Sequence, residues 1–235
     1  MAVSPIYPLS AAWAVSYMAW AVRGRSSSVF APSVWHGLRR RKAIALTFDD
    51  GPSESTREIL EILAKYDARA TFFQCGANVE RLPEIAHSVV EAGHEIGNHS
   101  HTHPYLFLRT PQEILDDLRR AQKAIETHTG ARPVLFRAPY GVRWRGLRAA
   151  QDHLKLTGVM WTAIGYDWKS TAEDVATRMG AKAENGAILC LHDGRELQPK
   201  PDIRATVEAV RTLVPMLQGM GYKLETVSQL LCPKN

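Results

Sequence analysis

From residue 43 onward, short apolar runs of strand type alternate with segments whose apolar residues recur at helical spacing. Residues 43–48 form an apolar, largely β-favouring run that predicts a buried strand. We predict further strands at 70–73, 134–136, 158–161, 187–191 and 223–226. We predict helices over 55–66, after Pro83, over 111–128, after a cap at Thr171, and over 203–218.

This alternation indicates an α/β fold built on a parallel sheet, either open or closed into a barrel. The connections between the predicted elements are short, and no segment repeats along the chain. We therefore predict one catalytic domain over residues 43–235.

The first 22 residues contain no charged side chain, and Arg23 and Arg25 follow them directly. About 20 apolar residues can span a bilayer, and the Trp and Tyr residues here suit its interface. We predict a membrane anchor over 1–22, followed by a basic linker over 23–42. The alternative is a first helix packed on the domain. The arginines after the segment would hold the domain in the cytoplasm, so the side of the membrane stays open.

Composition is that of a globular protein, with 45% hydrophobic and 23% charged residues. The net charge of +5 suits an anionic surface, such as a membrane face or an acidic glycan. Much of the positive charge lies in residues 39–42, beside the predicted anchor, so we expect no nucleic-acid partner. The three cysteines are odd in number and form no CxxC pair, and we expect Cys75 and Cys190 to be buried thiols.

Two adjacent carboxylates, Asp49 and Asp50, stand where the first strand ends in Gly51-Pro52. A turn at a strand end can direct both side chains into one pocket, although strand neighbours normally point to opposite faces. One carboxylate would then bind a metal and the other would move a proton. The alternative is a pair of solvated acids that cap the following helix.

Residues 99–103 hold three histidines before Pro104. On one helical turn His99 and His103 share a face, while His101 points elsewhere. Two imidazoles and one carboxylate form a catalytic zinc site with an open position, and Asp50 is the natural third ligand. The alternative is a polar loop that is rich in histidine.

Further polar residues follow later strands. Arg137 can grip a carboxylate in bidentate fashion, Trp168 offers a flat wall beside Asp167, and His192 is a suitable general acid. In parallel α/β folds the carboxyl ends of the strands carry the site, so we expect these residues to meet there.

Together these residues form motifs that resemble those of the polysaccharide deacetylases, the NodB-type domain of carbohydrate esterase family 4. The resemblance covers about residues 43–231. The motifs are TFDDGP at 47–52, a five-residue His-Ser-x-x-His segment at 99–103, Arg-Ala-Pro-Tyr at 137–140, Asp-Trp at 167–168, and a strand that ends in His192. The resemblance implies a distorted (β/α)7 barrel and one divalent metal ion, Zn²⁺ first and Co²⁺, Mn²⁺ or Ni²⁺ as alternatives.

The resemblance also implies a role for each matching residue. Asp50, His99 and His103 correspond to metal ligands, Asp49 to the catalytic base and His192 to the general acid. Arg137 corresponds to the residue that orients the base, with Asp167 as its charge partner. Pro139, Tyr140, Trp168 and Leu191 correspond to substrate-binding positions, with the Tyr140 N–H facing the oxyanion.

Two positions depart from the family pattern. Cys190 replaces a usual leucine, which we expect to alter a pocket wall rather than the mechanism. Residues 164–166 lack an acid that many members carry, which leaves the tuning of His192 open.

The function expected from this resemblance is removal of N-acetyl groups from N-acetylglucosamine-type residues of a peptidoglycan-like or chitin-like polymer, with release of acetate. We expect a monomeric catalytic domain, anchored to the membrane of the cell envelope. One alternative is a deacetylase or deformylase of a membrane lipid-linked amino sugar. The other is a non-catalytic carbohydrate-binding relative, which would need neither Asp49 nor His192.

Overall fold

The fold is built on an eight-stranded sheet in which all neighbouring strands run parallel. The computed structural model describes residues 6–232. The strand order is β5-β4-β3-β2-β1-β7-β6, and β8 pairs with the start of β1. The strands are β1 (Ala43–Gly51), β2 (Ala70–Gln74), β3 (Glu95–Asn98), β4 (Leu135–Phe136), β5 (Thr157–Gly158), β6 (Ala163–Ile164), β7 (Ile188–His192) and β8 (Lys223–Leu224).

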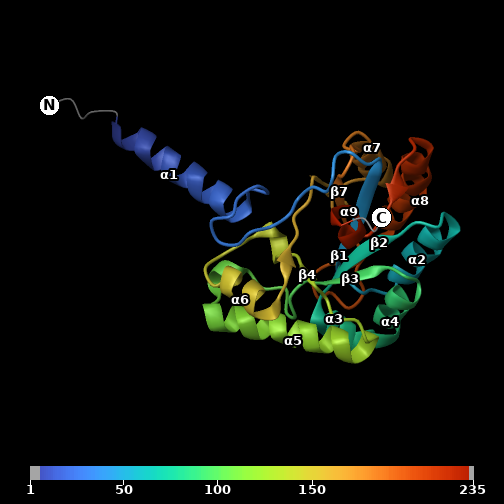
Figure 1. Ribbon diagram of the computed structural model, residues 1–235, viewed down its shortest axis with the longest axis horizontal. Coiled ribbons are helices and arrows are strands. Elements are labelled where there is room, and N and C mark those ends of the chain that lie inside the picture. Colours follow the sequence, from blue (N-terminus) through green and yellow to red (C-terminus); the bar gives the residue numbers. More distant parts are fainter. Residues whose placement is uncertain (1–5, 233–235) are drawn as a thin grey trace.

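Helices surround this sheet, with α5 and α6 on one side and α2, α7 and α8 on another (Figure 1). The helices are α1 (Ile6–Arg23), α2 (Thr56–Lys65), α3 (Gly76–Arg81), α4 (Pro83–Glu91), α5 (Pro111–Thr129), α6 (Leu147–Leu154), α7 (Ala172–Gly180), α8 (Arg204–Gly219) and α9 (Val227–Leu231). A large apolar cluster fills the space between the sheet and α2, α7 and α8.

The sheet curls into an incomplete barrel. Side chains of β4 and β7, which three other strands separate, belong to one apolar cluster together with residues of α9. The segment before β1 spans the open side, because Val34 bridges to Val159 and His36 bridges to Ala187. The prediction of a distorted α/β barrel is confirmed.

Strong local signals begin two helices at their predicted positions. The Thr110 hydroxyl accepts the N–H of Glu113, and the Glu113 side chain accepts the N–H of Thr110, so a capping box begins α5. Gly130 ends the helix with a φ of 71°. Thr171 caps α7 in the same manner as Thr110, by accepting the N–H of Asp174.

The N-terminal residues form α1, and its side chains from residue 11 to 20 are exposed. The predicted anchor covers residues 1–22, of which 1–5 lie outside the described part of the chain. Among the described residues, no helix combines the length and the apolarity that a bilayer crossing needs.

The segment predicted as a basic linker is packed on the domain. The buried Arg143 guanidinium donates to the carbonyl of Ser27 at 2.6 Å and to that of Gly24. Ala31 is buried in the cluster around α5 and α6. The domain therefore includes residues well before the predicted boundary at 43.

Candidate active site

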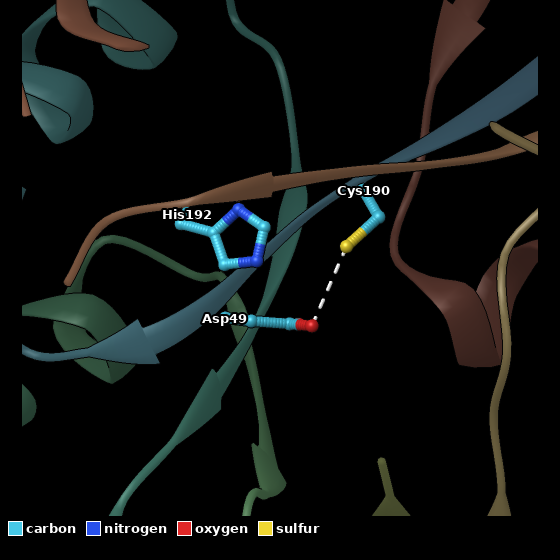
Figure 2. A group of neighbouring side chains, drawn as sticks. All are labelled: Asp49, Cys190 and His192. Atoms are coloured by element: carbon cyan, nitrogen blue, oxygen red, sulfur yellow. Dashed lines mark hydrogen bonds between the residues drawn. The ribbon is translucent and has the colours of Figure 1, made fainter. Parts of the chain in front are cut away.

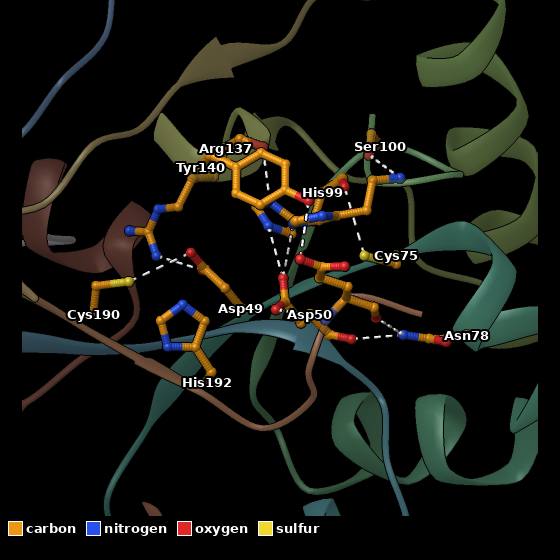
Figure 3. A network of polar contacts seen from close by, with 12 residues as sticks. Asp49, Asp50, Cys75, Asn78, His99, Ser100, Arg137, Tyr140, Cys190 and His192 are labelled. Atoms are coloured by element: carbon orange, nitrogen blue, oxygen red, sulfur yellow. Dashed lines mark hydrogen bonds and ion pairs between the residues drawn. The ribbon is translucent and has the colours of Figure 1, made fainter. Parts of the chain in front are cut away.

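A carboxylate and two imidazoles converge where β1 ends. The Asp50 Oδ1 atom lies 3.2 Å from His99 Nε2 and 3.1 Å from His103 Nε2, and all three side chains are buried (Figure 3). Asp50 has a φ of 71°, in the left-handed region, so the backbone turns sharply at this residue. This turn lets Asp50 face the histidines while Asp49 faces β7.

The two histidines meet through a loop, and the prediction of a helical turn over 99–103 is wrong. Ser100 and His103 both have positive φ values, 67° and 50°, and the Ser100 hydroxyl accepts the N–H of His103 at 3.0 Å. Asp117 binds the backbone N–H of His101 at 2.7 Å, which holds this histidine away from the others.

These three residues fit a divalent metal ion. His99 Nδ1 lies 2.8 Å from the Arg137 carbonyl, so Nδ1 carries a proton and Nε2 is the nitrogen that faces Asp50. The second oxygen of Asp50 accepts the N–H of Glu196 at 2.8 Å. Burial favours the neutral acid, but hydrogen bonds from His103 and His99 hold the pKa of Asp50 well below its usual value. A charged carboxylate and two imidazole nitrogens form a suitable ligand set.

Asp49 is held on both of its oxygens. Arg137, which is fully buried, donates to Oδ1 at 2.6 Å and to the Thr47 hydroxyl at 2.8 Å. The Cys190 thiol lies 3.4 Å from Oδ2 (Figure 2). Burial raises the pKa of the Cys190 thiol well above its usual value, so the sulfur keeps its proton and acts as the donor.

Cys190 therefore contacts the candidate base, and it is not among the described residues that line the cavity. The expectation that it alters a pocket wall is wrong, because alternation along β7 directs this side chain toward Asp49. The sequence showed only that a thiol stands where a leucine is usual.

His192 is held by Asp167, and the expected partnership between Asp167 and Arg137 is wrong. The Asp167 carboxylate binds His192 Nδ1 at 2.8 Å, the His192 N–H at 2.8 Å and the Thr206 hydroxyl at 2.7 Å. Burial lowers the pKa of His192, but the charge and hydrogen bond of Asp167 outweigh it and raise the pKa to about 9. The tuning of His192 is thus supplied by Asp167, despite the missing acid in residues 164–166.

One cavity of about 260 Å³ joins these groups. Among the predicted site residues, its walls include Asp49, Asp50, His99, His103, Tyr140, Trp168 and His192. Pro139 and Leu191 are buried and do not line it, and Leu191 packs in the cluster beneath the outer helices.

The cavity walls also include residues that sequence reasoning missed, namely Arg23, Trp161, Arg195 and Glu196. Trp161 follows β5, and Arg195 and Glu196 follow β7, so the strand-end rule could have identified them. No sequence pattern identified Arg23, because its position beside the site depends on contacts between segments that are far apart in the chain.

Comparison with known proteins gives one consistent family. A family model for polysaccharide deacetylase matches residues 36–159. The peptidoglycan-N-acetylmuramic acid deacetylase PdaC of Bacillus subtilis is 36% identical over 81% of this chain and 39% of its own length. The chitooligosaccharide deacetylase of Bradyrhizobium is 34% identical over 80% of this chain and 90% of its own length.

Solved structures of the same family are also similar to this chain. BA3943, a pseudoenzyme of the CE4 family from Bacillus anthracis, is 30% identical with a TM-score of 0.77, over 85% of this chain and 68% of its own. The chain spans about two fifths of the length of the first curated relatives it matches. Because the matches cover most of the barrel that carries these residues, the chain belongs to the polysaccharide deacetylase family, carbohydrate esterase family 4.

Proposed function

We propose that the protein is a metal-dependent deacetylase that removes N-acetyl groups from N-acetylglucosamine-type residues of a peptidoglycan-like or chitin-like polymer. One observation carries this proposal. Asp49, which Arg137 holds in place, and His192, whose pKa is raised, line the same cavity as the metal-binding trio of Asp50, His99 and His103. The named relatives act on peptidoglycan sugars and chitooligosaccharides, which supports this substrate class.

Asp50, His99 and His103 would hold the metal ion, for which we propose Zn²⁺, with Co²⁺, Mn²⁺ and Ni²⁺ as alternatives. When bound, a divalent ion polarises the acetamide carbonyl and makes water more acidic. The hydrogen bonds from His99 Nδ1 to the Arg137 carbonyl and from the Glu196 N–H to Asp50 orient the ligands before any metal arrives.

The protein side chains then move the protons. Asp49 accepts a proton from water as the water attacks the amide carbon, and Arg137 and Cys190 keep its oxygens in place. The Tyr140 N–H donates to the oxyanion. His192 donates its proton to the amide nitrogen as the C–N bond breaks, so acetate and a free amine leave.

The direct test uses the full chain, purified and supplied with metal, and follows acetate release from N-acetylglucosamine oligomers and from peptidoglycan. We expect release that a chelator abolishes and added Zn²⁺ restores. A protein that binds stoichiometric metal yet releases no acetate from either polymer would refute the proposal, and would favour a non-catalytic, carbohydrate-binding protein.

A second candidate is deacetylation or deformylation of a lipid-linked amino sugar at a membrane. The exposed apolar side chains of α1 favour it, since Trp13 is 76% exposed, Val15 70% and Tyr17 56%. Aromatic residues of this kind suit a membrane interface, and we infer membrane association through residues 1–22 at the cell envelope. Co-sedimentation of the full chain with anionic vesicles tests this, with Trp13→Ser as the variant expected to weaken binding.

A further inference from the structure

A second cavity adjoins the active site. It has a volume of about 690 Å³ and shares Arg23, Trp161 and Ile164 with the cavity that holds the metal-binding trio. This volume is in the range that accommodates a small organic ligand. The two cavities are therefore continuous, and a substrate whose acetamide group lies beside Asp49 can extend into the second cavity.

Basic side chains dominate the charge of this second cavity. Arg23, Arg25, Arg178 and Lys182 line it, and Glu184 is the one acidic residue among its described lining. Glu184 already faces two other basic groups, because His36 lies 3.4 Å and Arg39 3.3 Å from its oxygens. Within residues 11–232, none of the four lining cations has a carboxylate partner within 4.0 Å.

Two of these cations, Arg25 and Arg178, are held in position by uncharged groups. The Arg25 guanidinium donates to the Thr162 carbonyl at 2.5 Å and stacks 4.8 Å from the ring centre of Trp35. Arg178 donates to the Gly165 carbonyl. Carbonyls and rings orient a guanidinium but leave its net charge for a ligand.

We propose that this cavity binds an anionic group, a carboxylate or a phosphate, that the substrate carries beyond the sugar being deacetylated. This inference rests on the proposed function. Guanidinium groups pair with such oxyanions in bidentate fashion, and the Trp161 and Tyr166 rings beside them suit a sugar face. Arg23 and Arg25 precede residue 36, where the family match begins, so this chain's own N-terminal segment supplies half of the positive charge.

The test compares matched substrates that differ only in the anion. One pair is a muramic-acid-containing peptidoglycan tetrasaccharide and the same molecule with its lactyl carboxylates methylated. The other pair is chitobiose 1-phosphate and chitobiose. For each pair we would measure the ratio of kcat/KM, anionic over neutral, with the full metal-loaded chain.

Lys182→Gln and Arg23→Gln remove the two cations that make no described hydrogen bond, and Lys123→Gln and Arg132→Gln are matched exposed controls. We expect the wild-type ratio to exceed one and to fall with rising salt. Each cavity variant should lower it about threefold and the double variant about tenfold, while the controls leave it unchanged. A preference for the carboxylate pair would identify a peptidoglycan strand, and one for the phosphate pair a phosphorylated sugar.

Ratios near one for both pairs, or equal effects of cavity and control variants, would overturn the inference while leaving the deacetylase intact. Equilibrium binding of the same four compounds separates the two proposals. Tighter, Lys182-dependent binding of an anionic compound with no acetate release would support the anion site and refute the proposed function.

Discussion

At the scale of single residues, each candidate for proton transfer is paired with a group of opposite charge, and one of the two pairings was expected. Arg137 holds Asp49, as the resemblance implied, whereas Asp167 holds His192 rather than Arg137. The sequence identified all four side chains, because each lies at the end of a strand or shortly after it. It assigned the wrong partner to Asp167, since the direction of a side chain in a strand-end loop depends on the packing of two segments far apart in the chain.

Asp49→Asn should strongly reduce turnover while metal binding persists. The amide cannot accept a proton, so we expect kcat to fall by about 10²–10⁴-fold. Asp49 does not belong to the group of Asp50, His99 and His103 to which we assign the metal, so metal content per chain should match the wild type. Asp50→Asn is the paired variant and should lose metal as well as activity. Near-normal turnover by Asp49→Asn, measured as acetate release, would refute the assignment of the base.

Asp167→Asn should lower the upper pH limit of activity. His192 must be protonated to act as an acid, and its pKa of about 9 keeps it so across neutral pH. The amide would keep a hydrogen bond to the imidazole but remove the charge that raises this pKa. We expect the alkaline limb of kcat to shift from about pH 9 toward the ordinary value of about 6.5.

The pH profile of kcat checks this prediction, with Asp116→Asn as a control on the surface of α5, where the carboxylate pairs with Arg119. An alkaline limb that stays in place in Asp167→Asn would show that His192 is not the titrating acid.

At the scale of elements, long helices with clear caps were predictable and short elements were not. The start and end of α5 follow from Thr110, Pro111 and Gly130, which act within one or two turns of the chain. The helices α3, α6 and α9 were missed because five to eight residues carry too little periodicity. Their stability comes from packing against other elements, which a local pattern does not record.

Gly76, the first residue of α3, tests such packing. A Cβ atom at this position would lie 2.8 Å from the Cα atom of Ala121 in α5, so the two helices approach through the absent side chain. Gly76→Ala should therefore force α3 and α5 apart and destabilise the protein by about 1–3 kcal/mol. Gly219→Ala, where no atom lies within 4 Å, is the matched control. Urea unfolding of both variants measures the difference, and equal stability would show that this contact is not rigid.

At the scale of the whole molecule, the fold class followed from the order of strands and helices, but the role of the N-terminal segment did not. Parallel pairing and short connections restrict the chain to a curled sheet with helices outside. The bridges of Val34 and His36, and the burial of Arg143 against the carbonyls of residues 24 and 27, join segments more than 100 residues apart. No local pattern encodes such contacts, and they place Arg23 beside the active site.

Stability of the whole domain should depend on pH through His94, a buried imidazole outside the active site. Burial, together with the nearby charge of Arg69, lowers the pKa of His94 to about 4. Its Nδ1 atom accepts the N–H of Ala70 at 3.3 Å, which requires the neutral ring. In the unfolded chain the same group titrates near its usual value of about 6.5.

Between these two values the unfolded state binds more protons than the folded state, so the free energy of unfolding falls as the pH drops from about 6.5 toward 4. The full difference of about 2.5 pKa units corresponds to about 3 kcal/mol. His94→Gln should remove this contribution to the pH dependence. The free energy of unfolding of the variant should therefore fall by about 2–3 kcal/mol less than that of the wild type over that pH range. Urea unfolding at about pH 6.5 and about pH 4 measures this change in the free energy of unfolding, and a chelator in both samples excludes a contribution from metal loss. His153→Gln, an exposed histidine on α6, should follow the wild type, and identical pH dependence for His94→Gln would show that this imidazole is not held neutral by the fold.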